Sequence, residues 1–151
     1  MNRMRKRQIV TFWVDECLVG LDILEVREIN RFLDITPVQQ APEYVLGLMN
    51  LRGQMVTVFD LGVRLGLPSR EFSPESHNVI LKNEPVGLLV DAVGEVVQAE
   101  DNEIEAPPAN LHNIEGEFIA GVLKLADEVL VILSAEKLLH HRMMDEGLKK
   151  T

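Results

Sequence analysis

The acidic run around position 100 contains the side chains of this chain that come closest to a catalytic spacing. Four carboxylates and a later histidine make up the group, namely Glu100, Asp101, Glu103, Glu105 and His112. One carboxyl group could donate a proton while another group accepts one, which is the chemistry of a hydrolase. The run lies in a polar segment with no pocket signature, so a solvated surface is the favoured interpretation. A small hydrolase that uses Glu100 to Glu105 is the remote alternative.

The other candidate groups lack the neighbours that catalysis or metal binding needs. His140 and His141 are adjacent on a predicted helix, so their side chains diverge by about 100° and cannot bind one metal ion. Cys17 is the single cysteine and has no nearby cation to make it reactive. The glycine-rich, nucleophile-elbow and zinc-binding motifs are missing from the sequence. We therefore expect no enzyme activity, no catalytic residue, no metal site and no cofactor.

Charge is distributed unevenly along the 151 residues. The net charge is −9, and the first seven residues hold four of the 15 cations and no acid. The remainder therefore carries 11 cations against 24 acids, or −13. A body this acidic repels the phosphates of nucleic acids and favours partners with basic faces. We expect protein partners and no nucleic acid.

The N-terminal apolar run is too short to reach across a membrane. It extends from Ile9 to Val14 and stops at two acids, Asp15 and Glu16. A lone cysteine is also typical of a reducing compartment. We expect a cytoplasmic protein without direct membrane insertion.

Short apolar segments separated by Gly, Pro, Asn or Asp predict an all-β fold. The predicted strands are 8–14, 18–24, 26–32, 46–51, 55–59, 79–82, 86–90, 93–98, 119–125 and 128–133. Asp60 and Ser134 are each placed to cap a short helix, and the second of these is the C-terminal helix.

One strand-rich unit occurs twice in the chain. Gly47-Leu48-Met49 matches Gly121-Val122-Leu123 at an offset of 74, and Val19-Gly20-Leu21 matches Val86-Gly87-Leu88 at an offset of 67. Five strands can curl into a small closed barrel. We predict two packed five-stranded barrels within a single domain, 8–140. The lobes are approximately 8–67 and 77–140, with or without strands exchanged between them, and they are flanked by a basic segment, 1–7, and a polar tail, 141–151.

The two copies differ at one turn. The first copy has Asn50-Leu51-Arg52-Gly53 where the second has Lys124-Leu125-Ala126-Asp127. The fold therefore closes this turn without arginine, whereas a glycine or aspartate suits a positive φ. Arg52 is either a solvated turn cation or a functional residue. Glu28 recurs as Glu95, which leaves open whether it is functional or marks the solvent face of a strand.

Several motifs, in order, resemble the CheW family of chemotaxis coupling proteins. They are Val19 to Ile23, Val26-x-Glu28-Ile29, Ala41-Pro42, Asn50 to Gly53, Val56 to Leu61, Val86 to Leu88, Val90-Asp91-x-Val93 and Glu136 to Leu139. The likeness covers about Gln8 to Leu139. It implies two SH3-like barrels and a scaffold that joins the cytoplasmic domain of chemoreceptors to the regulatory domain of a CheA-type histidine kinase in signalling arrays.

The resemblance also implies where the partners bind. Receptor-binding residues carried over from the family are Val26, Glu28, Asn50, Arg52 and Gly53. Kinase-binding candidates are the apolar residues Val86, Leu88 and Val96, which follow no motif. The same residues would serve a coupling module of a kinase pathway other than chemotaxis, such as surface motility, and that alternative stays open.

Overall fold

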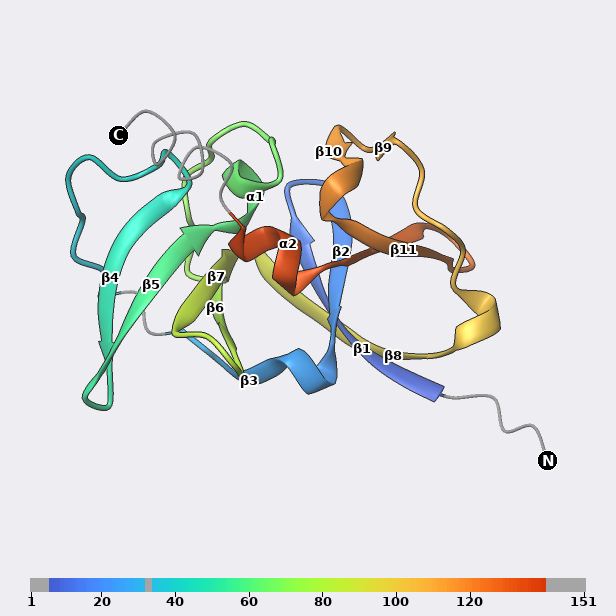
Figure 1. Ribbon diagram of the computed structural model, residues 1–151, viewed down its shortest axis with the longest axis horizontal. Helices are drawn as coiled ribbons and strands as arrows, with labels where there is room; N and C mark the ends of the chain where they lie inside the picture. Colours follow the sequence, from blue (N-terminus) through green and yellow to red (C-terminus); the bar gives the residue numbers. More distant parts are fainter. Residues whose placement is uncertain (1–5, 32–33, 141–151) are drawn as a thin grey trace.

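Strands dominate the fold and form two five-stranded sheets that lie side by side (Figure 1). The computed structural model describes residues 6–31 and 34–140, so the predicted tail 141–151 and most of the basic segment 1–7 lie outside the described residues. No helix in the described part of the chain is long and apolar enough to cross a membrane.

One sheet, the terminal lobe, is built from the first two and last two long strands of the chain together with a strand from its middle. Its spatial order is β11 (Ile119–Lys124), β12 (Val129–Leu133), β2 (Cys17–Asp22), β1 (Lys6–Val14) and β8 (Ala92–Glu100). The other sheet, the central lobe, has the order β3 (Val26–Asn30), β6 (His77–Leu81), β7 (Val86–Val90), β5 (Gln54–Asp60) and β4 (Val45–Leu51). All ten predicted strands are present, and the predicted all-β class is confirmed.

Local capping chemistry explains the short helices. The Asp60 side chain accepts from the Val63 amide at 3.3 Å and begins α1 (Leu61–Arg64). Ser134 accepts from the Lys137 amide at 3.2 Å and begins α2 (Ala135–Leu139). Both predicted helices are confirmed, but α2 ends at Leu139, so His140 follows the helix instead of lying on it, and His141 lies outside the described residues.

The remaining short elements were not expected from the sequence. The predicted strand 18–24 ends early, because the Asp22 carboxylate accepts from the Leu24 amide at 2.9 Å and starts a 3₁₀ turn, η1 (Ile23–Glu25). Two further 3₁₀ turns are η2 (Asp101–Glu103) and η3 (Gly116–Phe118). A small pair, β9 (Asn110–Leu111) and β10 (Ile114–Glu115), lies between the predicted strands 93–98 and 119–125.

The two halves of the chain follow one pairing scheme. In the central lobe Thr57 pairs in parallel with Val86, and in the terminal lobe Val131 pairs in parallel with Val19. These positions are equivalent, since 131 − 57 = 74 and 86 − 19 = 67. The repeat found in the sequence is therefore a structural repeat with matching strand register.

The hairpins repeat in the same way. Gly47 pairs with Val58, and Gly121 pairs with Ile132, so both partners differ by 74 (121 − 47 and 132 − 58). Each glycine also directly follows a shift in register. Both copies therefore have a register shift at the equivalent position.

Each lobe combines strands from both halves of the chain. The strands β1 and β2 of the first half lie with β8, β11 and β12 of the second, and β6 and β7 lie with β3, β4 and β5. The contiguous boundaries 8–67 and 77–140 therefore do not describe the lobes, which have exchanged strands. The strands are exchanged because of the connection that follows the second strand of each half. Asp91 alone separates β7 from β8, which is too short for a hairpin, so the chain continues into the neighbouring lobe.

Three apolar clusters form the core. One lies within the terminal lobe and contains Ile9, Leu18, Ala99, Leu123, Leu130 and Ile132. A second lies within the central lobe and contains Met49, Leu51, Val56, Val58, Ile80 and Leu89. The third and largest takes residues from both lobes, including Phe12, Val19, Phe59 and Leu88. The strands are apolar on both faces because one face fills a barrel and the other packs against the sister lobe.

Candidate protein-docking site

The β4–β5 hairpin closes with a two-residue turn that the sequence only partly specifies. Leu51 pairs with Gln54, so Arg52 and Gly53 are the two central residues. Their φ angles are 50° and 90°, which is typical of a type I′ turn. The Gly53 amide donates to the Asn50 side chain at 2.8 Å. The predicted positive φ at Gly53 is confirmed.

Arg52 occupies a position that does not favour arginine. A left-handed backbone costs a non-glycine residue roughly 1–2 kcal/mol, and asparagine or glycine is the usual residue here. The side chain is 58% exposed, so burial does not compensate for this cost. The backbone geometry therefore indicates that Arg52 is not a functionally neutral turn residue and that its guanidinium group has a role.

The guanidinium group of Arg52 forms an ion pair with Glu28 on β3. Asn30 donates to the other oxygen of the same carboxylate at 3.1 Å. The hydrogen bond from Asn30, followed by the contact with Arg52, lowers the pKa of Glu28 despite partial burial. Arg27 also donates to the Gln54 side chain at 2.8 Å.

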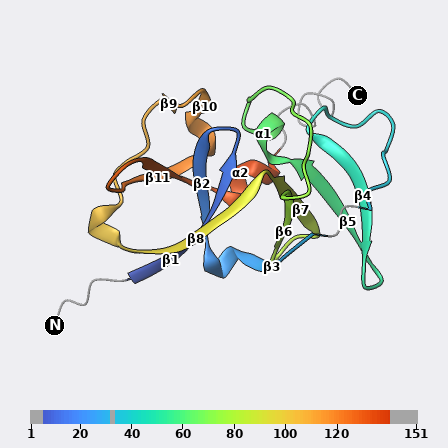
Figure 2. The ribbon, with the colours of Figure 1, turned by 180° about the vertical axis from the view of Figure 1, so that it is seen from behind.

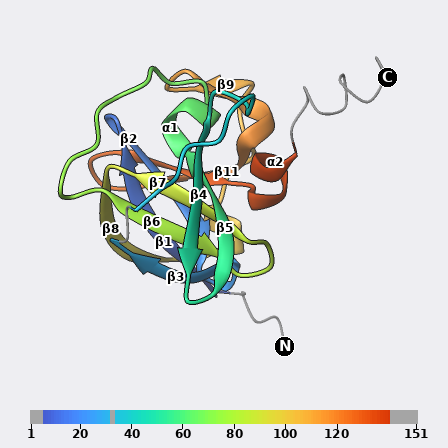
Figure 3. The same cartoon turned by 90° about the vertical axis from the view of Figure 1, so that its left-hand side faces the viewer.

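These contacts join the two edges of the central lobe. In the order of the sheet, β3 and β4 are the outermost strands, yet the β4–β5 turn reaches β3 through its side chains. Figure 3, viewed toward β4 and β5, shows the turn and β3 at the same end of the lobe. The curled sheet therefore exposes Arg52, and the ion pair with Glu28 holds its guanidinium group in one orientation.

The structure brings together four of the five residues expected to bind a receptor, namely Glu28, Asn50, Arg52 and Gly53. Val26 lies on the same strand but is half-buried and packs against the core between the lobes. Asn30 was not predicted from the sequence. Its position two residues after Glu28 was the available signal, because alternate residues of a strand lie on one face.

The second copy has no equivalent of this site. Its β11–β12 turn also has two central residues, Ala126 and Asp127, and the Leu125 amide donates to the Glu128 carbonyl at 2.8 Å. Neither Ala126 nor Asp127 has a positive φ, so the expectation for Asp127 was wrong. Within residues 6–31 and 34–140, no ion pair forms at Glu95. The charged pair distinguishes the central lobe from the terminal lobe.

The three kinase-binding candidates do not form one surface. Leu88 is fully buried, so its side chain cannot contact a partner, and that prediction is corrected. Val86 is half-buried against the same core, because alternate residues of β7 face the junction between the lobes. Val96 is 52% exposed on β8, which Figure 2 shows in the other lobe.

The acidic run after Gln98 has structural roles. Glu100 and Glu103 cap η2 reciprocally, and Asp101 pairs with Arg7 at 2.9 Å. Glu105 lies 3.6 Å from Lys124. A hollow of about 250 Å³ is lined by Lys6, Gln98, Ala99, Glu100 and Glu103, without the His112 that a hydrolase would need.

Metal binding and thiol chemistry have no support in the described part of the chain. No three His, Cys, Asp or Glu side chains there are grouped to hold a metal ion. Cys17 is buried, and burial, together with Asp15 and Glu16, raises the pKa of its thiol.

The geometry is that of a small β-barrel scaffold, a protein that offers surfaces to other proteins. The sequence profile of the CheW-like domain matches residues 8–143. The chain therefore belongs to the CheW-like domain family, whose members are non-catalytic scaffold proteins of chemotaxis signalling, and it is not an enzyme.

Relatives and a solved structure agree with this assignment. The chain is 34% identical over 134 residues to the chemotaxis protein CheW of Rhizobium meliloti, covering 86% of this chain and 85% of the relative. It is 34% identical over 139 residues to CheW of Treponema pallidum, covering 87% and 81%. The crystal structure of the scaffolding protein TtCheW from Thermoanaerobacter tengcongensis matches with a TM-score of 0.84 and 35% identity, covering 91% of this chain and 95% of that chain. The predicted SH3-like barrels are thereby confirmed.

Proposed function

We propose that this protein is a cytoplasmic adaptor that couples the cytoplasmic tips of chemoreceptors to the regulatory domain of a CheA-type histidine kinase. The observation that carries the proposal is Arg52, which is held at a positive φ and paired with Glu28 on an exposed hairpin. Within a family of chemotaxis scaffold proteins, a costly and solvent-facing arginine is best explained by a partner.

The receptor-facing surface in this proposal is the turn and strand around the ion pair. Glu28, Asn50 and Gly53 position the turn, and Arg52 presents its remaining N–H donors to solvent. An exposed ion pair stabilises a fold by only about 0–1 kcal/mol. Its main effect is to hold the guanidinium group in one orientation for an acidic or carbonyl group of the receptor.

The kinase-facing surface in this proposal is the outer edge of the terminal lobe. Val96 and Val93 are exposed on β8, with accessible fractions of 52% and 36%. The strand β8 is an edge strand, as β3 is in the central lobe. Exposed valines on an edge strand suit the docking of one barrel against another. Two distinct surfaces on two lobes let the adaptor hold both partners at once.

Each contact needs only moderate affinity. Specific protein interfaces bury roughly 1,200–2,000 Å² in total. When one small protein carries two such surfaces, each binding event raises the effective concentration of the other partner in an ordered array. The adaptor would then influence the kinase through geometry rather than chemistry, which is an allosteric coupling.

Calorimetry with a receptor cytoplasmic fragment and the kinase regulatory domain, singly and together, tests this proposal. We expect Arg52→Ala to weaken binding of the receptor fragment only, and Val96→Asp to weaken binding of the kinase domain only. Matched controls are Lys124→Ala, an exposed cation beside the equivalent turn, and Leu24→Asp, an exposed apolar residue outside both surfaces. Wild-type protein that binds neither partner, or two partners that exclude each other, would refute the adaptor.

A further inference from the structure

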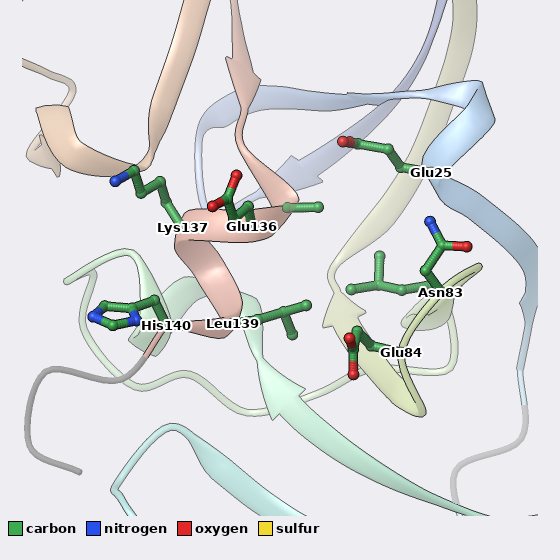
Figure 4. A pocket seen from close by; sticks show the side chains of 9 residues that line it. Glu25, Asn83, Glu84, Glu136, Lys137, Leu139 and His140 are labelled. Atoms are coloured by element: carbon green, nitrogen blue, oxygen red, sulfur yellow. The ribbon is translucent and has the colours of Figure 1, made fainter. Parts of the chain in front are cut away.

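A pocket of about 730 Å³ opens between α2 and the turn that joins β6 to β7 (Figure 4). It is lined by Glu25, Leu81, Asn83, Glu84, Ala135, Glu136, Lys137, Leu139 and His140. In Figure 4, Glu25, Asn83 and Glu84 lie on one side of this α2 pocket, and α2 forms the other. The pocket is not part of the docking site around Arg52.

The lining combines aliphatic side chains with an acidic rim, in which three carboxylates outnumber the single cation, Lys137. Leu81, Leu139 and Ala135 supply aliphatic surface, and Glu25, Glu84 and Glu136 supply carboxylates. Within the described residues, none of these three carboxylates forms an ion pair. Such a lining favours a segment that carries both aliphatic and cationic side chains.

The electrostatics of the pocket point to a cationic ligand. Partial burial, and then the neighbouring Asp22, raise the pKa of Glu25, whereas Arg7 acts in the opposite direction. Burial and a like charge both disfavour an ionised carboxylate. A cation placed in the pocket would favour the charged form of Glu25.

The wall formed by α2 is fixed in place from its far side. Arg64 on α1 donates from Nε to the Leu138 carbonyl at 2.7 Å and from Nη2 to the Lys137 carbonyl at 3.3 Å. These contacts hold α2 in place independently of the residues on the opposite side of the α2 pocket.

We propose that the chain's own segment from residue 141 onward binds in the α2 pocket. The segment starts at the rim, because it directly follows His140, which lines the pocket. It opens with His141, Arg142, Met143 and Met144, so a cation and two flexible apolar side chains come first. Over 141–151 it has three Lys or Arg against two acids, a net charge of +1 beside an acidic rim. Both features match the lining.

Methyl NMR on the full chain tests this proposal. The triple substitution Arg142→Glu, Met143→Ser and Met144→Ser should shift the signals of Leu81 and Leu139, while Val96, exposed on β8 outside the pocket, should stay unchanged. A synthetic peptide with the wild-type 141–151 sequence, added to that variant, should restore the original signals in a saturable manner that salt weakens.

A matched substitution tests the rim. Glu84→Lys in the wild-type background should shift Leu139 toward its position in the triple variant. Unchanged Leu81 and Leu139 signals in the triple variant would overturn the proposal. It would also be overturned if the receptor fragment, rather than the peptide, moved these signals, because the pocket would then serve a partner.

Discussion

Tyr44 and Phe118 both contact the same cation, the guanidinium group of Arg64. The guanidinium carbon of Arg64 is 4.6 Å from the centroid of each ring. The two aromatic residues are equivalent in the repeat, since 118 − 44 = 74. Arg64 also donates to the carbonyl of Leu138, its own equivalent, because 138 − 64 = 74. A single arginine therefore links the two copies at the place where their equivalent residues meet.

We predict that Arg64→Ala lowers the free energy of unfolding by roughly 2–4 kcal/mol. The change removes two cation–π contacts and the hydrogen bonds to the C-terminal carbonyls of α2. Urea unfolding measures the effect, with the exposed Arg27→Ala as a control. A loss for Arg64→Ala no larger than for Arg27→Ala would contradict the linking role.

Arg52→Gly should separate function from stability. Glycine accepts the positive φ without strain, so the free energy of unfolding should stay constant or rise by about 1 kcal/mol. Receptor binding should weaken, as in Arg52→Ala. Thermal unfolding and calorimetry on the same samples measure both effects. A large drop in melting temperature for either variant would show that Arg52 is structural instead.

Asn78 is a polar residue in the core of the central lobe. It is fully buried and its Nδ2 donates to the Met49 sulfur at 3.1 Å, while its Oδ1 has no hydrogen-bond partner among the residues that the structure describes. Its equivalent in the terminal lobe by strand pairing is Ile9, because Asn78 pairs with Leu89, Ile9 pairs with Asp22, and 89 − 22 = 67. Each of these two residues packs against an equivalent glycine, Gly87 or Gly20.

We predict that Asn78→Ile stabilises the protein by about 1–3 kcal/mol, because it removes a buried unsatisfied polar atom and the sister lobe already accommodates isoleucine there. Chemical denaturation measures the change. Ile9→Asn, the reciprocal variant, should destabilise the terminal lobe. If Asn78→Ile destabilised the protein, the interior of the central lobe would not accommodate isoleucine at this position as the terminal lobe does, despite the matching strand register.

The ion pair between Glu28 and Arg52 should respond to acid in one direction. The folded protein lowers the pKa of Glu28. The ion pair therefore contributes to the free energy of unfolding above the pKa that Glu28 has in the unfolded chain, and this contribution is lost as the pH falls through its pKa in the folded protein. Receptor binding should weaken over the same acidic range. Titration by NMR of Glu28, compared with Glu28→Gln, checks this. A pKa for Glu28 above that of a free glutamate would contradict it.

A cut between Glu71 and Phe72 should yield two fragments that fold only together. The first fragment holds β1 to β5 and the second holds the remaining strands, so neither contains all the strands of a five-stranded sheet. We expect each fragment alone to lack cooperative unfolding, and their mixture to regain the circular dichroism and binding of the intact chain. A first fragment that unfolds cooperatively as a monomer would contradict the exchanged arrangement.

Much of the secondary structure could be predicted from the sequence, because its causes are local. Short apolar segments separated by turn residues predicted the ten strands of the two sheets. Asp60 and Ser134 predicted the helix starts, since a cap acts within three residues of the chain. Gly53 predicted its own positive φ, and the repeat predicted two lobes of five strands.

The tertiary structure alone decided which strands share a lobe. A repeat has the same sequence whether its strands pair within one half or between halves, so it could not locate the lobes. That choice depends on the single residue between β7 and β8 and on packing across the junction, which also buried Leu88. The contact of Arg52 with Glu28 and Asn30 likewise required the sheet to curl until its two edges met. Sequence patterns report neighbours along the chain, whereas these relationships join residues that only the closed barrel makes neighbours.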